Sequence, residues 1–98
     1  MIIRIFKVKI PKDMQQEFEA KFKEISAPVV QKFKGLLSLE IGSPTRWNPE
    51  DYVMISRWES EEDLIVFAGE NWNEAHIPKG MEKFGREYSV SHYLEIQR

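Results

Sequence analysis

The sequence contains no cysteine, and this absence excludes disulfide bonds, thiolate metal sites and cysteine nucleophiles. A chain without cysteine fits a reducing compartment. The sequence also lacks any apolar run near the ~18 residues that span a bilayer. Its first ten residues, MIIRIFKVKI, interleave charged and apolar side chains, unlike the apolar core of a secretion signal. We therefore expect a cytoplasmic protein with no membrane partner.

Neither sign of charge dominates, because 14 basic residues stand against 16 acidic ones and the net charge is −2. The basic residues are spread among the acids, so we expect no nucleic-acid partner. The two histidines, His76 and His92, are far apart in the sequence and have no third ligand at metal-binding spacing. Glycine-rich phosphate loops and a serine nucleophile elbow are also absent. We expect no metal and no cofactor.

The length of 98 residues predicts a single domain covering residues 1–98, with no linker or repeat. Such a chain buries roughly 60–70 % of the surface that its unfolded form exposes, which supports one core. The hydrophobic content of 42 % and charged content of 31 % are ordinary for a globular protein.

The first half of the chain predicts a strand, a long helical segment and a second strand. Residues 1–10 are rich in Ile, Val and Phe and end at Pro11, which indicates a strand. From residue 12 to Gly35 the apolar residues follow a helical period. Pro28 leaves two alternatives, a kinked helix or a second helical segment capped by Ser26 or Ala27. The helical face consists of Met14, Phe18, Phe22, Ile25 and Val29.

The second half predicts two further strands around a helix. LLSLEIG (residues 36–42) reads as a strand with Leu37, Leu39 and Ile41 on one face, and YVMISRW (52–58) reads as the next. Ser60 and Asp63 have the spacing of a capping box at the start of a helix that ends before Gly69. Residues 88–96 alternate in polarity, which indicates a final strand.

The order β-α-β-β-α-β predicts an α+β fold of the ferredoxin-like type, a four-stranded antiparallel sheet with both helices on one face. The other face carries Ile3 and Ile5, and no segment remains to cover them. We therefore expect a second copy of the chain to cover this face, forming a homodimer.

Two stretches, YVMISRWESEEDLIVFAGENW (residues 52–72) and SVSHYLEI (89–96), resemble the antibiotic biosynthesis monooxygenase family. The resemblance covers essentially the whole chain. It implies a dimeric α+β barrel with a pocket between sheet and helices, where relatives bind flat aromatic ligands. The family includes cofactor-free quinone-forming oxygenases, haem-degrading enzymes and isomerases, so the resemblance alone does not name a reaction.

Matched residue by residue, the resemblance disfavours haem degradation. Haem-degrading members use an Asn on the first strand, a Trp on the second helix and a His just after it. These positions fall on Phe6, on Phe67 and, after a one-residue gap, on His76. Polyketide-oxidising members place an Asn four residues before a strand-ending Trp. Here Trp58 matches the Trp, but Met54 takes the Asn position.

The stretch GENWNEAHIPKG (residues 69–80) holds two candidate site residues, Trp72 and His76. If this segment is helical, the two share one face. One interpretation is a pocket wall in which Trp72 stacks on a planar ligand and His76 acts as acid, base or haem ligand. The alternative is a Trp that plugs the core beside a rim His.

His92 and Arg4 are the other candidates, because each has the parity of apolar neighbours on its strand. His92 is either a satisfied core histidine or a catalytic base that burial keeps neutral. An inward Arg4 needs a partner, which is Glu40, Glu95 or an anionic group of a ligand.

Two functional hypotheses follow. The first is a cofactor-independent monooxygenase of a small quinol- or phenol-like substrate, with His92 or His76 as the base and Arg4 stabilising the oxyanion. The second is a non-catalytic dimeric module that binds a small hydrophobic or haem-like ligand. A stable dimer without a ligand is the simplest form of this second hypothesis. For the monooxygenase, the predicted substrate-binding walls are Phe6, Phe18, Phe22, Met54, Phe67 and Trp72.

Overall fold

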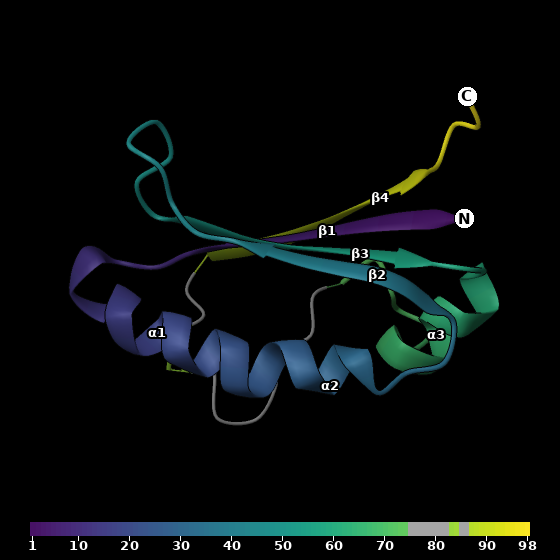
Figure 1. The fold of residues 1–98 in the computed structure, drawn as a ribbon, viewed down its shortest axis with the longest axis horizontal. Helices are drawn as coiled ribbons and strands as arrows, with labels where there is room; N and C mark the ends of the chain where they lie inside the picture. Colours follow the sequence, from purple (N-terminus) through teal and green to yellow (C-terminus); the bar gives the residue numbers. More distant parts are fainter. Residues whose placement is uncertain (75–82, 85–86) are drawn as a thin grey trace.

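The computed structural model describes residues 1–74, 83–84 and 87–98, and their elements follow the predicted order (Figure 1). A short 3₁₀ turn, η1 (Lys12–Met14), follows the first strand. The strands are β1 (Ile2–Lys9), β2 (Leu36–Gly42), β3 (Asp51–Trp58) and β4 (Glu87–Leu94). The helical segments are α1 (Gln15–Lys21), η2 (Phe22–Ser26), α2 (Ala27–Gln31) and α3 (Glu61–Ala68).

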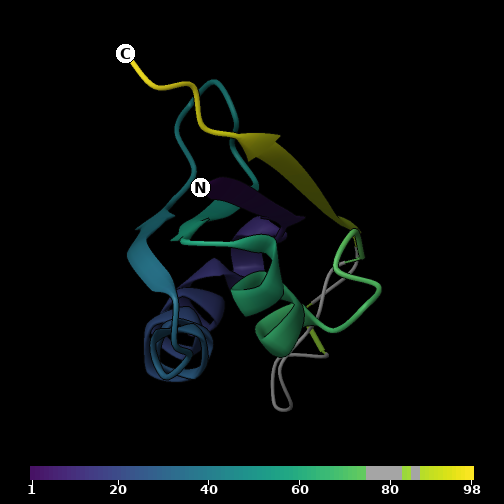
Figure 2. The same cartoon turned by 90° about the vertical axis from the view of Figure 1, so that its right-hand side faces the viewer.

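The four strands form one antiparallel sheet in the order β2-β3-β1-β4. Seen end-on, the helical segments all lie on one face of this sheet (Figure 2). This confirms the predicted ferredoxin-like α+β fold. The register places Arg4 of β1 between Ser56 of β3 and His92 of β4, so all three residues point to the helix-covered face.

The first helical region is a continuous rod rather than two separately capped helices (Figure 1). Ser26 has helical backbone angles and makes no capping hydrogen bond, so the predicted alternative of a capped second segment is wrong. The turn before Pro28 widens into the π-helical segment η2. Pro28 has no N–H to donate to Glu24 and its ring crowds that carbonyl, which gives a physical reason for the wider turn.

Strand β2 departs from the predicted alternation at its start. The register with β3 shifts between Leu36 and Ser38, so Leu37 falls in a bulge and is 49 % exposed. Leu39 packs against the core as expected. Sequence alternation cannot reveal an inserted bulge residue, and the predicted grouping of Leu37 with Leu39 is therefore wrong.

Helix α3 begins and ends as the sequence predicts. The Ser60 hydroxyl accepts a hydrogen bond from the Asp63 backbone N–H at 3.2 Å, which confirms the N-cap. The helix ends at Gly69, which has a φ of +85°. None of the helices in the described parts of the chain is long and apolar enough to cross a membrane.

The core lies between the sheet and the helices. Trp58 is completely buried, and its indole N–H donates to the hydroxyl of buried Ser56 at 2.9 Å. The remaining buried apolar residues include Ile2, Val8, Ile10, Phe18, Phe22, Val30, Tyr52, Met54, Leu64, Ala68 and Phe84.

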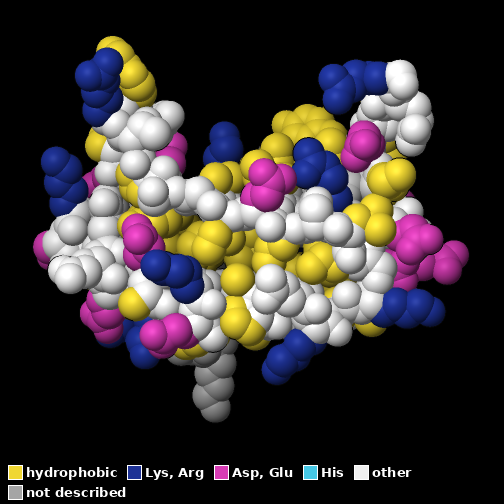
Figure 3. Space-filling model, viewed as in Figure 1, with side chains coloured by type: hydrophobic (Ala, Val, Ile, Leu, Met, Phe, Trp, Pro, Cys, Tyr) yellow, Lys and Arg dark blue, Asp and Glu magenta, His cyan; other side chains and the backbone are white. Residues whose placement is uncertain are grey.

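No helix of the described residues covers the opposite face of the sheet (Figure 2). The register places Ile3, Ile5, Val53 and Ile55 on this outer face, all of them only partly buried. Tyr93 lies beside Ile3 on the same face and is 55 % exposed. The β2–β3 loop and the C-terminal tail project from this side, with hydrophobic side chains on and between them (Figure 3).

Candidate functional site

The most unusual polar group of the described core is the guanidinium of Arg4, a residue only 4 % exposed. Its Nη1 donates to the backbone carbonyl of Trp72 at 2.6 Å and lies 2.8 Å from Nε2 of His92. Its Nη2 lies 3.3 Å from the carbonyl oxygen of Glu74. Arg4 therefore joins β1, β4 and the turn after α3, three segments that are distant in the sequence.

The contact with Arg4 fixes the tautomer of His92. A guanidinium has five N–H donors and no acceptor, so Nε2 of His92 must supply the lone pair. The proton of the neutral imidazole then sits on Nδ1. The basic nitrogen of His92 is thus occupied by Arg4, and the ring offers an N–H donor at its other side.

The charges of this pair follow from its surroundings. Burial lowers the pKa of Arg4 to about 10, so the guanidinium remains cationic at neutral pH. Burial, and then the nearby positive charge of Arg4, lower the pKa of His92 to about 4. Near neutral pH, the pair therefore consists of a cation and a neutral imidazole.

Aromatic rings flank the pair. The Trp72 ring meets the His92 ring edge-on, with centroids 4.6 Å apart and planes at 86°. The Arg4 guanidinium carbon lies 5.7 Å from the Phe67 ring centroid. Phe67 in turn stacks on Trp58, with centroids 5.1 Å apart. Arg4, His92, Phe67 and Trp72, all predicted from the sequence, form one cluster, which we call the Arg4 site.

The other predicted wall residues lie elsewhere in the core. Phe18 and Phe22 stack on each other with centroids 4.9 Å apart and contact Tyr52, at the β2–β3 loop end of β3. Met54 is buried, and Phe6 is partly buried with its ring 6.5 Å from that of Tyr88. The predicted site residue His76 lies outside the described residues.

The expected carboxylate partners of Arg4 are on the wrong face of the sheet. Glu40 lies opposite Ile55 and forms a 3.0 Å ion pair with Arg57 on the outer face. Glu95 also pairs with Arg57, at 3.6 Å from its Nε. Among the described residues, no carboxylate lies within 4.0 Å of the Arg4 guanidinium. Within the described part of the chain, the hydrogen-bond partners of Arg4 are two carbonyls and an imidazole.

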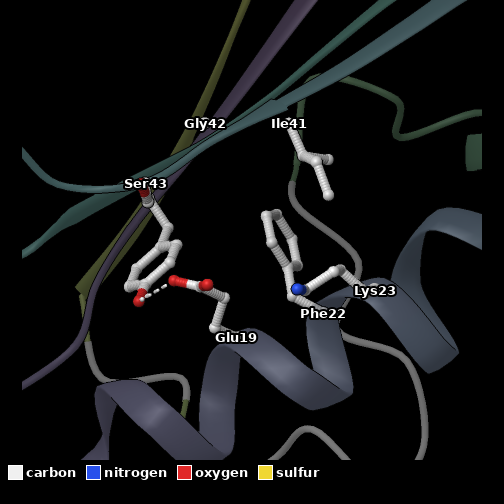
Figure 4. A pocket seen from close by; sticks show the side chains of 7 residues that line it. Glu19, Phe22, Lys23, Ile41, Gly42 and Ser43 are labelled. Carbon is white, nitrogen blue, oxygen red and sulfur yellow. Dashed lines mark hydrogen bonds between the residues drawn. The ribbon is translucent and has the colours of Figure 1, made fainter.

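A separate open cleft of about 200 Å³ lies between the rod and the end of β2 (Figure 4). Its polar centre is a hydrogen bond from the Tyr52 hydroxyl to Oε1 of Glu19 at 3.1 Å. Burial and this bond raise the pKa of Tyr52 to about 12. Sequence reasoning missed this pair, although an inward Tyr on a strand signals that its hydroxyl needs a partner. The other lining residues are Phe22, Lys23, Ile41, Gly42 and Ser43.

The described residues contain no group of three or more His, Asp or Glu side chains arranged to hold a metal ion. Among the described residues, His92 provides the imidazole of the Arg4 site. Its Nε2 faces the Arg4 cation, so this nitrogen could bind iron only if Arg4 moved away. Nδ1 carries the proton in this arrangement and is not a ligand in that form.

Solved structures with the same fold come from several bacteria, although their sequences differ widely. One is the haem-degrading MhuD of Mycobacterium tuberculosis with two haems bound in its active site. Its sequence is 19 % identical, the TM-score is 0.73, and the match covers 100 % of this chain and 98 % of that one. A candidate antibiotic biosynthesis monooxygenase from Deinococcus radiodurans has 10 % identity, TM-score 0.75 and coverage of 100 % and 95 %. One from Nitrosomonas europaea has 11 % identity, TM-score 0.74 and coverage of 99 % and 100 %.

Comparison of the sequence with curated proteins gave no match. The model of the antibiotic biosynthesis monooxygenase family, in contrast, matches residues 1–71. This region includes β1 with Arg4, β3, α3 with Phe67 and the start of the turn that carries Trp72. The fold, the element order and this match agree, and the chain belongs to the antibiotic biosynthesis monooxygenase family.

Proposed function

We propose that this protein is a cofactor-independent monooxygenase of a small aromatic substrate, such as a phenol or quinol. The observation that carries the proposal is the contact between Nη1 of Arg4 and Nε2 of His92 at 2.8 Å, beside the Trp72 ring. A buried cation without a carboxylate partner among the described residues can stabilise an anion that forms on a bound ligand. Membership of the monooxygenase family supports the same reading.

The proposed reaction needs electrons from the substrate only. A phenol gives up its O–H proton, and the electron-rich anion reduces O₂. One oxygen atom bonds to the ring carbon opposite the phenolic oxygen, and the other leaves as water with the two hydrogens that the substrate loses. The product is a quinone. Arg4 would stabilise the negative charge on the substrate oxygen. The candidates for the base are His76 and His92, and His92 can act as one only when its Nε2 is released from Arg4.

The aromatic residues of the cluster suit a flat substrate. Trp72 is partly exposed and offers a ring surface next to His92, while Phe67 lies under the guanidinium of Arg4. Phe6, Phe18, Phe22 and Met54 remain the proposed apolar walls further from the pair. In this proposal, binding of the ring depends on Trp72, and stabilisation of charge depends on Arg4.

Oxygen consumption with a panel of phenols and quinols tests the proposal. We expect consumption above a blank without enzyme for at least one substrate, and a loss of about 10²-fold or more in kcat for Arg4→Gln, because one transition-state donor contributes on that order. His76→Ala and His92→Ala test the two candidate bases. Val66→Ala, on the exposed side of α3, is the matched control and should retain full activity. A panel that never exceeds the blank would contradict the proposal.

A second candidate function is binding of haem or a similar flat hydrophobic ligand without catalysis. The likeness to MhuD favours it as a fold-level analogy. The family resemblance, however, places Phe6 and Phe67 where haem-degrading members use Asn and Trp. Titration with hemin would distinguish it, because a histidine ligand shifts the Soret band of haem. A shift that disappears in His76→Ala would support haem binding through that residue. An unchanged spectrum would argue against haem binding and would not affect the monooxygenase hypothesis.

We also propose that the protein is a cytoplasmic homodimer that buries the outer face of the sheet. The apolar side chains Ile3, Ile5, Val53 and Ile55 lie next to one another there, and a patch of this kind on a sheet favours a partner. Trp47, on the loop that projects from this side, is 77 % exposed, which suits a contact with the second copy.

A further inference from the structure

The Arg4 site presents hydrogen-bond donors that the described residues do not use. Arg4 makes two of its contacts through Nη1 and one through Nη2. Among the described residues, no acceptor lies at Nε or at the second hydrogen of Nη2. Because a guanidinium cannot accept a hydrogen bond, these positions can be satisfied only by an oxygen, a nitrogen lone pair or an anion.

His92 adds another donor rather than an acceptor. Its single lone pair, on Nε2, faces Arg4, so the ring can offer a ligand only its Nδ1–H. His92 is also partly exposed, in contrast to Arg4, and it lies on β4, the edge strand of the described sheet, where a ligand can reach it. The chemistry of the site is therefore one-sided: it can donate hydrogen bonds to a ligand but has no base with a free lone pair among the described side chains of the cluster.

The charge of the site also favours a ligand that accepts hydrogen bonds, in particular an anion. Arg4 is a buried cation, and its partners in the described chain are neutral groups: two carbonyls, an imidazole and the Phe67 ring. Burying an uncompensated charge is costly, and an anion that binds beside it offsets that cost. The Trp72 ring next to His92 provides a flat apolar surface beside this charge.

We propose, resting on the function proposed above, that the substrate binds as an oxyanion already formed, the phenolate or enolate of a planar ring. Arg4 receives the oxygen, and His92, held in its Nδ1–H form by Arg4, offers a second N–H. The ring lies against Trp72. The substrate loses its O–H proton to water before it binds, so His92 acts as a donor in this scheme and no protein base is required for that proton.

Binding of 4-nitrophenol tests this, because its phenolate absorbs visible light and its electron-poor ring resists oxidation. At a pH near its own pKa, we expect the protein to raise the phenolate absorption of 4-nitrophenol. The uncharged analogue 4-nitroanisole should bind at least about tenfold more weakly, since hydrogen bonds to charged groups are stronger by that order. Arg4→Gln should abolish the preference. Arg46→Gln, which removes an exposed arginine on the β2–β3 loop, should leave it unchanged.

Three results of this binding assay would contradict the proposed phenolate site. Equal binding of 4-nitroanisole, binding of 4-nitrophenol in its neutral form, or no binding of either would overturn it. If Arg4→Gln does not fold, judged by circular dichroism, His92→Phe provides the second variant: it removes one donor and should weaken phenolate binding more than nitroanisole binding. Because this assay involves no turnover, phenolate binding without oxygen consumption would refute the monooxygenase and leave the anion site standing.

Discussion

Arg4 and His92 face each other across β1 and β4, and the guanidinium donates to Nε2 of the imidazole at 2.8 Å. A cation beside an imidazole opposes its protonation, which would place two positive charges side by side and remove the lone pair that accepts the bond. The pair therefore holds together only while His92 is neutral. This relationship links the chemistry of the site to the stability of the fold.

The first prediction concerns acid stability. The pKa of His92 is lowered to about 4 in the folded protein, whereas an unfolded imidazole titrates near 6.5. Between these values the unfolded state binds more protons, so the free energy of unfolding falls as the pH drops from 6.5 to about 4. Urea denaturation across this range should show a smaller fall in His92→Gln, whose amide oxygen can still accept from Arg4. If the free energy of unfolding falls by the same amount in the wild type and in His92→Gln over this pH range, the prediction is contradicted.

The sequence predicted that Arg4 and His92 are site residues, but it did not predict that they contact each other. Alternation along each strand placed Arg4 and His92 on the inward face, and the register that brings them together depends on which strands pair. The bonds from Arg4 to the carbonyls of Trp72 and Glu74 have no signature in the sequence, because every residue has a carbonyl. The predicted carboxylate partners Glu40 and Glu95 were wrong for this reason: two of the three acceptors that the described residues offer Arg4 are backbone carbonyls.

The elements of the fold were easier to predict because local patterns determine them. The Ser60 cap and the end of α3 at Gly69 depend on residues a few positions apart. The bulge at Leu37 and the Tyr52–Glu19 bond depend on contacts across the sheet or between sheet and helix, which periodicity does not record.

The second prediction compares two glycines that both have a positive φ. Gly35 has a φ of +90°, and Gly69 has a φ of +85° with a ψ of 178°, so alanine should strain the backbone at both positions, by roughly 1–3 kcal/mol. A Cβ at Gly35 would also lie 2.3 Å from Cγ of Asp63, while a Cβ at Gly69 would meet nothing within 4 Å. We expect Gly35→Ala to lower the free energy of unfolding clearly more than Gly69→Ala. If urea denaturation shows that both variants lose the same free energy of unfolding, the Asp63 side chain moves aside at no cost.

The third prediction concerns the buried bond between Trp58 and Ser56. The indole N–H has the Ser56 hydroxyl as its acceptor at 2.9 Å, and both residues are buried. Ser56→Ala leaves that N–H without an acceptor and should reduce the free energy of unfolding by about 1–3 kcal/mol. Ser89→Ala, an exposed position on β4, is the control and should change stability by less than about 0.5 kcal/mol. A Ser56→Ala protein as stable as the control would mean that water replaces the hydroxyl.

The fourth prediction tests the dimer through the centre of the outer face. Ile55 lies opposite Ile5 there, and an aspartate at position 55 would place a charge in the proposed interface. We expect the wild type to sediment at twice the mass of the chain and Ile55→Asp at the mass of a single chain. Val66→Asp introduces the same charge at a 73 % exposed position on α3 and should remain dimeric. A wild type that sediments as a single chain at micromolar concentration would refute the dimer, and the apolar outer face would then need a different partner.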